Sequence, residues 1–235
     1  MNRKNTLITI AENQQKVYEA GKDKMLSDMW ENIQNSGERT EYSRAFCGWI
    51  LDKDMFKPQH DIKMSNSQYL FYASKGNLDL IEVEKECGIV IDFSETTIMS
   101  GAFQSAAVSR INVIDASNVT SINYLFSTGG SYYHEMLKWV NKLIIQKGAT
   151  VTNAFQNVKG LEHCLFEGVI SVNGLNVSSC TLLDRESLLS IISCLEDKTE
   201  DTSGTVWKVT LGSTNVAKLT QTELDEIGAK GWTYS

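Results

Sequence analysis

Five phenylalanines recur along the middle of the chain, each preceded by an alanine or a leucine and each reached from a polar turn. The steps between them are 25, 32, 23 and 29 residues. A recurrence of 20–50 residues is typical of chains built from stacked structural units, in which each unit buries its apolar side chains against the next. We therefore predict a layered core made of Phe46, Phe71, Phe103, Phe126 and Phe155.

Short apolar runs lie between these phenylalanines and are bounded by Gly, Asn, Asp or Ser. Each run is too short for a helix, and several are rich in β-branched residues, which favours a strand. One strand per unit at this period falls in the length range of a leucine-rich repeat. The predicted strands are residues 78–81, 89–93, 111–114, 143–145 and 169–172.

The two ends of the chain differ from this middle part. Residues 6–35 carry apolar side chains at helical spacing, and this helix is expected either to cap the domain or to form a homo-oligomer. In the tail, Asp184 is expected to cap a helix, and residues 205–211 alternate as a strand does. Thr220 and Glu223 form a capping-box signature for a last helix.

We therefore expect an α+β fold: an irregular leucine-rich-repeat-like solenoid with an N-terminal helix and a C-terminal helix-strand-helix cap. The expected boundaries are residues 1–40 for the helical segment, 41–182 for the solenoid and 183–235 for the cap. An ordinary α+β domain, in which the phenylalanines recur by chance, is the competing interpretation because the periods vary.

The strand, the polar turn and the Ala-Phe or Leu-Phe step of each unit resemble the BspA-type leucine-rich repeats of bacteria. An ordered set of segments over most of the chain is also similar to proteins encoded in the tail-gene regions of phages and prophages of gut Firmicutes. These segments are 17–22, the helix around Trp30, 35–42, Ala45-Phe46, 56–58, 91–94 and the tail 187–232, which includes 209–212 and leads into 230–233.

The resemblance implies a tail-tip, fibre or baseplate-associated protein that acts through a repeat surface and has no catalytic residues. The N-terminal helical segment, residues 1–40, is then expected to attach the protein to a tail, as an alternative to capping the domain. Its expected partners are other tail or baseplate proteins, or a host-surface protein or glycan, and its expected location is the virion tail after synthesis in the bacterial cytoplasm. A bacterial adhesin-like interaction module is the first alternative, and a hydrolase of surface glycans is the second.

Charge and hydropathy narrow the classes of partner. The formal net charge is -7, and no basic stripe is present, which argues against binding to nucleic acid. No apolar run approaches the roughly 20 residues of a membrane helix, so we expect no membrane insertion. No signal peptide is evident at the start of the sequence.

No motif for catalysis, a metal or a cofactor is present, so we expect none of these. The five cysteines lack metal-ligand spacing, and they are expected to be reduced thiols. His163 and Cys164 are neighbours, but a nucleophile pair normally meets through the fold. Asp92 and Asp115 each follow apolar strand residues and are expected to bond turn backbone rather than a cation.

One aromatic tract is a candidate binding surface because exposed Tyr and Trp side chains stack on sugars and anchor protein partners. Its residues are Tyr124, Tyr132, Tyr133 and Trp139. The competing interpretation places Trp139 in the core and the tyrosines on an inert surface.

Overall fold

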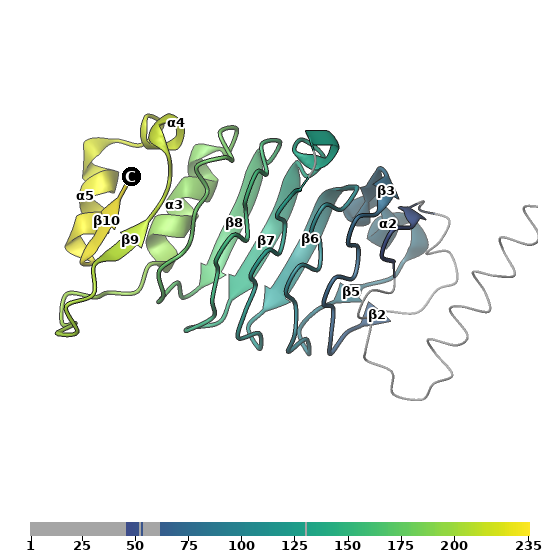
Figure 1. Cartoon of the computed structure of the whole chain (residues 1–235), viewed down its shortest axis with the longest axis horizontal. Coiled ribbons are helices and arrows are strands. Elements are labelled where there is room, and N and C mark those ends of the chain that lie inside the picture. Colours follow the sequence, from purple (N-terminus) through teal and green to yellow (C-terminus); the bar gives the residue numbers. More distant parts are fainter. Residues whose placement is uncertain (1–45, 52, 54–61, 130) are drawn as a thin grey trace, which may run out of the picture. The chain divides into compact units, whose positions relative to one another are not determined.

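The computed structural model describes residues 46–51, 53, 62–129 and 131–235 (Figure 1). The chain divides into two units, Met1–Arg39 and Thr40–Ser235, and all of the described residues belong to the second. The predicted helix over residues 6–35, and with it the predicted N-terminal segment, lies outside the described residues.

A four-stranded parallel sheet is the largest element of the second unit, and its strands lie side by side in chain order (Figure 1). It consists of β4 (Leu78–Asp79), β6 (Val108–Ala116), β7 (Trp139–Ile145) and β8 (His163–Gly168). Three further parallel pairs join β1 (Ile50–Leu51) to β3 (Lys75–Gly76), β2 (Ile62–Lys63) to β5 (Ile91–Asp92), and β9 (Trp207–Val209) to β10 (Trp232–Tyr234).

Four α-helices and one short 3₁₀ helix accompany these strands in the described part of the chain. They are α2 (Leu80–Cys87), η2 (Ser131–Tyr133), α3 (Arg185–Cys194), α4 (Ser213–Val216) and α5 (Gln221–Ala229). Two predicted starts are confirmed: Asp184 caps α3, and Thr220 with Glu223 forms a capping box at α5. In both, a side-chain oxygen accepts an amide hydrogen that has no partner within the helix.

The predicted fold class is wrong. We expected an α+β fold with a leucine-rich-repeat-like solenoid between two terminal caps, but the structure is α/β, with a four-stranded parallel sheet and three separate two-stranded sheets. Apolar runs indicate where strands form, but their order does not show how they pair. Parallel pairing requires a long return connection between strands, and helix α2 lies in the connection between β4 and β6.

Two of the predicted strands are also misplaced. Residues 169–172 do not form a full strand, because β8 ends at Gly168 and Ile170 makes only an isolated bridge to Leu195. Residues 78–81 are divided between β4 and the first turn of α2. Asp79 causes this division, since its side chain accepts the Glu82 amide hydrogen and starts the helix.

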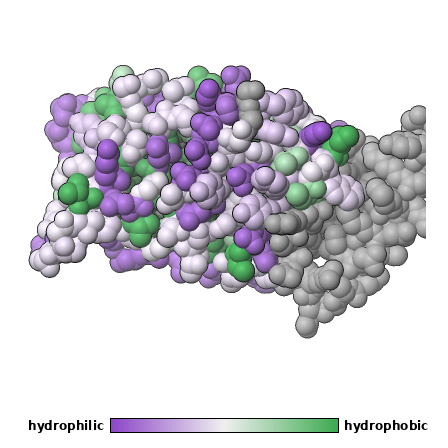
Figure 2. All heavy atoms as spheres, viewed as in Figure 1, coloured by the Kyte–Doolittle hydropathy of each residue, from purple (hydrophilic) through white to green (hydrophobic). Residues whose placement is uncertain are grey.

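The phenylalanine rings form a continuous ladder inside the second unit. Successive ring centroids lie 5.3, 5.3, 5.8 and 5.3 Å apart, and all five rings are at most 3% exposed. Phe155 also contacts Phe166 of β8 at 5.6 Å, so the ladder packs against the sheet. Figure 2 shows hydrophobic residues on the drawn face only as scattered spots. The ladder members are Phe46, Phe71, Phe103, Phe126 and Phe155.

Phe103 is the best position for testing the contribution of the ladder, because its ring touches Phe71, Phe93 and Phe126. We expect Phe103→Ala to lower the free energy of unfolding by about 3–5 kcal/mol, through lost burial and the cavity left behind. Tyr132→Ala is the control, since that side chain is 59% exposed and should cost less than about 0.5 kcal/mol. Urea denaturation measures both values, and equal costs would contradict a structural ladder.

Two glycines have almost the same φ angle but differ in the space available for a side chain. Comparing them distinguishes the cost of backbone strain from the cost of a steric clash. Gly148 has φ +86°, and a Cβ atom there would meet nothing within 4 Å. Gly168 has φ +87°, and a Cβ atom there would lie 2.1 Å from the carbonyl oxygen of Ile145 on the neighbouring strand. Both positions favour glycine, but only Gly168 lies where β7 and β8 approach too closely for a side chain.

Substitution of these two glycines should therefore have unequal effects. We expect Gly148→Ala to cost about 1–2 kcal/mol, the ordinary penalty of a left-handed alanine. Gly168→Ala should cost about 3 kcal/mol or more, because the alanine must also displace backbone. Thermal and urea unfolding of the two variants measure the difference, and equal losses would show that β7 and β8 are not this close.

Candidate functional site

The parallel sheet brings three unlike side chains into one row. Arg110 of β6 pairs in register with Trp139 of β7, which pairs with His163 of β8. The next residues along the same strands, Ile111, Val140 and Cys164, are buried. Successive side chains of a strand point to opposite faces of a sheet. Arg110, Trp139 and His163 therefore lie on the outer face. We call Arg110, Trp139 and His163 the sheet-face row.

Trp139 is held in place by contacts on two sides. Its ring stacks on the His163 ring with centroids 3.9 Å apart and an interplanar angle of 14°. Its indole Nε1 donates to Asn141 Oδ1, whose Nδ2 donates to Asn112 Oδ1 at 2.9 Å. His163 is only 6% exposed, whereas Trp139 is 36% exposed. The row therefore presents a partly exposed tryptophan in a fixed orientation.

Each end of the row meets an aspartate that also caps a helix. Asp79 caps α2, and its Oδ2 lies 2.8 Å from Arg110 Nε. Asp184 caps α3, and its Oδ2 lies 2.6 Å from His163 Nδ1. Sheet and helix starts are thus coupled at both ends, and the two carboxylates fix the outer members of the row.

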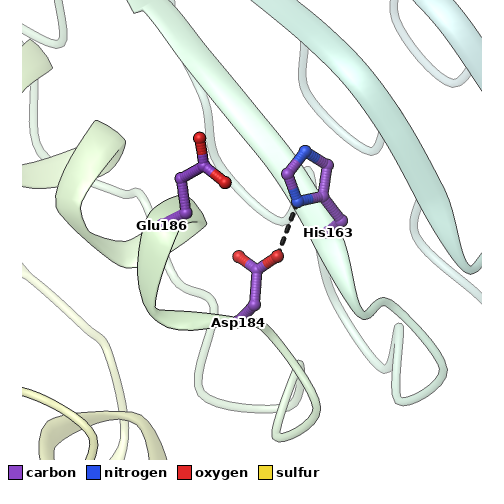
Figure 3. A group of neighbouring side chains, drawn as sticks. All are labelled: His163, Asp184 and Glu186. Carbon is purple, nitrogen blue, oxygen red and sulfur yellow. Dashed lines mark hydrogen bonds and ion pairs between the residues drawn. The ribbon is translucent and has the colours of Figure 1, made fainter.

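Figure 3 shows the second of these ends, where His163 of β8 faces Asp184 and Glu186 at the start of α3. Partial burial alone would raise the pKa of Asp184, but hydrogen bonds from Ser187 and His163 outweigh it, and the pKa lies below its usual range. The carboxylate is therefore ionised at neutral pH and accepts a hydrogen bond from the Nδ1–H group of His163. An ionised Asp184 is unsuited to act as a general acid.

His163, Asp184 and Glu186 are the described residues that could hold a metal ion, since one ligand atom of each lies within 4.8 Å of the others. Both oxygens of Asp184 are already engaged, Oδ1 by the Ser187 amide and Oδ2 by His163. The positive end of the α3 dipole favours carboxylates here and disfavours a cation. Helix capping therefore explains the cluster without an ion.

Cys164 does not form a nucleophile pair with its neighbour His163. Its side chain is fully buried on the inner face of β8, and its amide donates to Ser187 Oγ at 2.8 Å. Burial raises the pKa of the Cys164 thiol well above its usual value. The thiol is therefore protonated and unreactive at neutral pH.

The predicted turn role of two aspartates is confirmed. Asp92 Oδ1 accepts the amide hydrogen of Ser94 at 2.8 Å, and Asp115 Oδ1 accepts that of Ser117 at 2.9 Å. Each carboxylate closes a turn two residues ahead of it. Partial burial would raise the pKa of Asp92, but the bonds from Ser94 outweigh it and lower that pKa.

The four aromatic residues of the predicted binding surface do not form one cluster. Tyr132 and Tyr133 contact each other edge to face at 4.9 Å in η2. Tyr124 lies in a phenylalanine-bearing turn and is 42% exposed. Among the described residues, no ring contact joins any of these tyrosines to Trp139, whose ring partner is His163.

Sequence reasoning missed His163 and Arg110 as neighbours of Trp139. The predicted strand at 169–172 begins after His163 and does not contain it. The pairing of His163 with Trp139 could therefore not be predicted. A strand placed at 163–168, combined with parallel pairing, would have aligned all three positions.

No family model matches the chain, and neither the curated proteins nor the solved structures contain a match. The resemblance to BspA-type repeats therefore stays a prediction. Every helix within residues 46–51, 53, 62–129 and 131–235 is too short or too polar to span a bilayer.

The contact between Asp184 and His163 should make the free energy of unfolding depend on pH. Its lowered pKa stabilises the fold above the unfolded-state pKa near 3.8, and this stabilisation is lost as the pH falls through the folded-state pKa. We expect Asp184→Asn to cost about 1 kcal/mol at pH 7, because asparagine still caps α3 but no longer pairs as an anion with His163.

The difference in the free energy of unfolding between wild type and Asp184→Asn should then become smaller as the pH falls below 3.8. Urea midpoints at a series of pH values measure it. Asp184→Ala is the companion variant and should cost about 2 kcal/mol at pH 7, because the cap is lost as well. A wild-type advantage over Asp184→Asn that is the same at all pH values would contradict an ionised Asp184 carboxylate.

Proposed function

We propose that this chain is a tail-associated binding protein of a phage or prophage, and that it contacts a protein partner through the sheet-face row. The observation that carries the binding role is the partly exposed Trp139, held by His163 and Asn141 on a sheet. The tail association rests on the sequence resemblance.

The composition of the row supports a protein partner. Tryptophan and arginine are the residue types most enriched among those that dominate the binding energy of protein interfaces. Trp139 loses little side-chain entropy on binding, because its orientation is already fixed in the free chain. Arg110 is half exposed beside it and can hydrogen-bond a carboxylate or carbonyl group of the partner.

The geometry also favours a broad contact over a pocket. Two surface hollows of about 190 and 390 Å³ lie among the described residues, and neither is lined by a residue of the row. The smaller is lined by Asn153, Gln156, Asn157, Asn176, Ser178 and Ser179, and the larger by Cys47, Tyr69, Tyr72 and Gln104. The row instead crosses β6, β7 and β8, three neighbouring strands about 4.8 Å apart. A partner that rests on these strands contacts the exposed parts of Trp139 and Arg110, while the buried His163 supports the Trp139 ring from below.

Incorporation into particles tests this proposal. Particles are purified by density gradient from a strain that produces the chain, and the chain is quantified in them by mass spectrometry. We expect it in the tail fraction. Trp139→Ala should lower its incorporation by about 30-fold, as expected for an interface residue worth about 2 kcal/mol.

Tyr132→Ala is the matched control, because it removes another exposed aromatic ring that lies outside the row. Both variants must retain the wild-type melting temperature. Absence of the wild-type chain from particles would refute the tail role, and its presence on the cell surface would favour the adhesin-like alternative. Equal incorporation of both variants would refute the row as the contact.

A further inference from the structure

A second surface of the unit differs chemically from the sheet face. Four segments, 68–73, 100–105, 123–128 and 152–157, carry the phenylalanines of the ladder from Phe71 to Phe155 and lie side by side. The amide of Phe71 donates to Ala102 at 2.8 Å, that of Gly101 donates to Asn123 at 3.0 Å, and that of Tyr124 donates to Thr152 at 3.2 Å. Corresponding positions of the segments therefore form rows.

No charged residue and no histidine occurs in these four segments, although 22% of the chain is charged. Their exposed and half-buried side chains are amides, hydroxyls, tyrosines and one alanine. The sheet, in contrast, carries ion pairs such as Lys142 with Glu167. We call the following set the uncharged face: Gln68, Tyr69, Tyr72, Ala73, Ser100, Gln104, Asn123, Tyr124, Thr152, Asn153, Gln156 and Asn157.

This face carries two hollows, and the larger one is lined by Cys47, Tyr69, Tyr72 and Gln104. The smaller hollow has a volume of about 190 Å³, and its lining residues all end in an amide or a hydroxyl group: Asn153, Gln156, Asn157, Asn176, Ser178 and Ser179. The side chains of Asn153 and Gln156 make no hydrogen bond to any described residue. Each of these amides offers both donors and an acceptor, which are free to bind a ligand.

An exposed tyrosine lies in the segment next to Asn153, one of the lining residues of this hollow. Tyr124 and Asn153 occupy the same position in neighbouring segments, as the bond from the Tyr124 amide to the Thr152 carbonyl shows. Two segments away in the same row is Tyr69, and Gly101 between them has no side chain. At about 4.8 Å per step, the row from Tyr69 to Asn153 is about 14 Å long.

We propose that the uncharged face is a binding site for a neutral oligosaccharide, with one sugar residue in the smaller hollow and the next against Tyr124. Sugar hydroxyls both donate and accept hydrogen bonds, which matches the amides and hydroxyls of the lining. An acidic polymer is disfavoured because the face offers no cation. A protein partner is disfavoured because the hollow has no apolar centre of the kind that anchors interfaces.

This site uses none of the sheet-face row, so it stands whether or not a tail partner binds there. The test applies the full-length chain to a printed array of neutral and anionic oligosaccharides, followed by NMR titration of the strongest ligand. We expect a neutral oligosaccharide to bind. Asn153→Gly combined with Gln156→Ala should weaken that binding by about tenfold or more, through loss of two hydrogen-bonding amides.

The double variant is chosen so that it folds. Asn153 has φ +57°, which glycine adopts without strain, and Gln156 is exposed. Lys142→Ala on the sheet is the matched control and should bind the sugar as wild type does. The proposal is overturned if only anionic sugars bind, if no sugar binds, or if the double variant binds as tightly as the control.

Discussion

Parallel pairing of strands fixes where the side chains of this protein lie. In the four-stranded sheet, backbone hydrogen bonds place β6 beside β4, β7 beside β6 and β8 beside β7, so equivalent positions come into rows. On the inner side the rows are apolar and pack against the phenylalanine ladder. On the outer side the same register sets Arg110, Trp139 and His163 side by side. A one-residue slip of β7 would move Trp139 to the inner face.

The two ends of the row are stabilised by helix starts rather than by the sheet. Asp79 and Asp184 each bond an amide at the start of a helix and a basic or imidazole side chain of the row. Each carboxylate therefore binds both a backbone amide of a helix and a side chain of the sheet. These two hydrogen bonds keep Asp184 ionised and engage both of its oxygens. The cluster of Asp184 with His163 and Glu186 therefore needs no cation.

The sequence predicted those features that depend on local chemistry. The caps at Asp184 and Thr220 follow from residue type and spacing alone, and so do the turn bonds of Asp92 and Asp115. Features that depend on pairing were missed. The fold class was wrong because apolar runs do not reveal parallel register, and β8 was missed because His163 and Glu167 interrupt its apolar pattern. The cross-strand neighbours of Trp139, Arg110 and His163, lie 29 and 24 residues away in the chain.

The same register that builds the sheet-face row also builds the uncharged face. In the four segments that form the uncharged face, the backbone enters the left-handed region at non-glycine residues, among them Tyr69, Tyr124 and Asn153. Those positions carry an energetic cost, yet they hold amides and aromatic rings at the surface. The sheet-face row and the uncharged face have no side chain in common, so the two proposed ligands would not compete for the same residues.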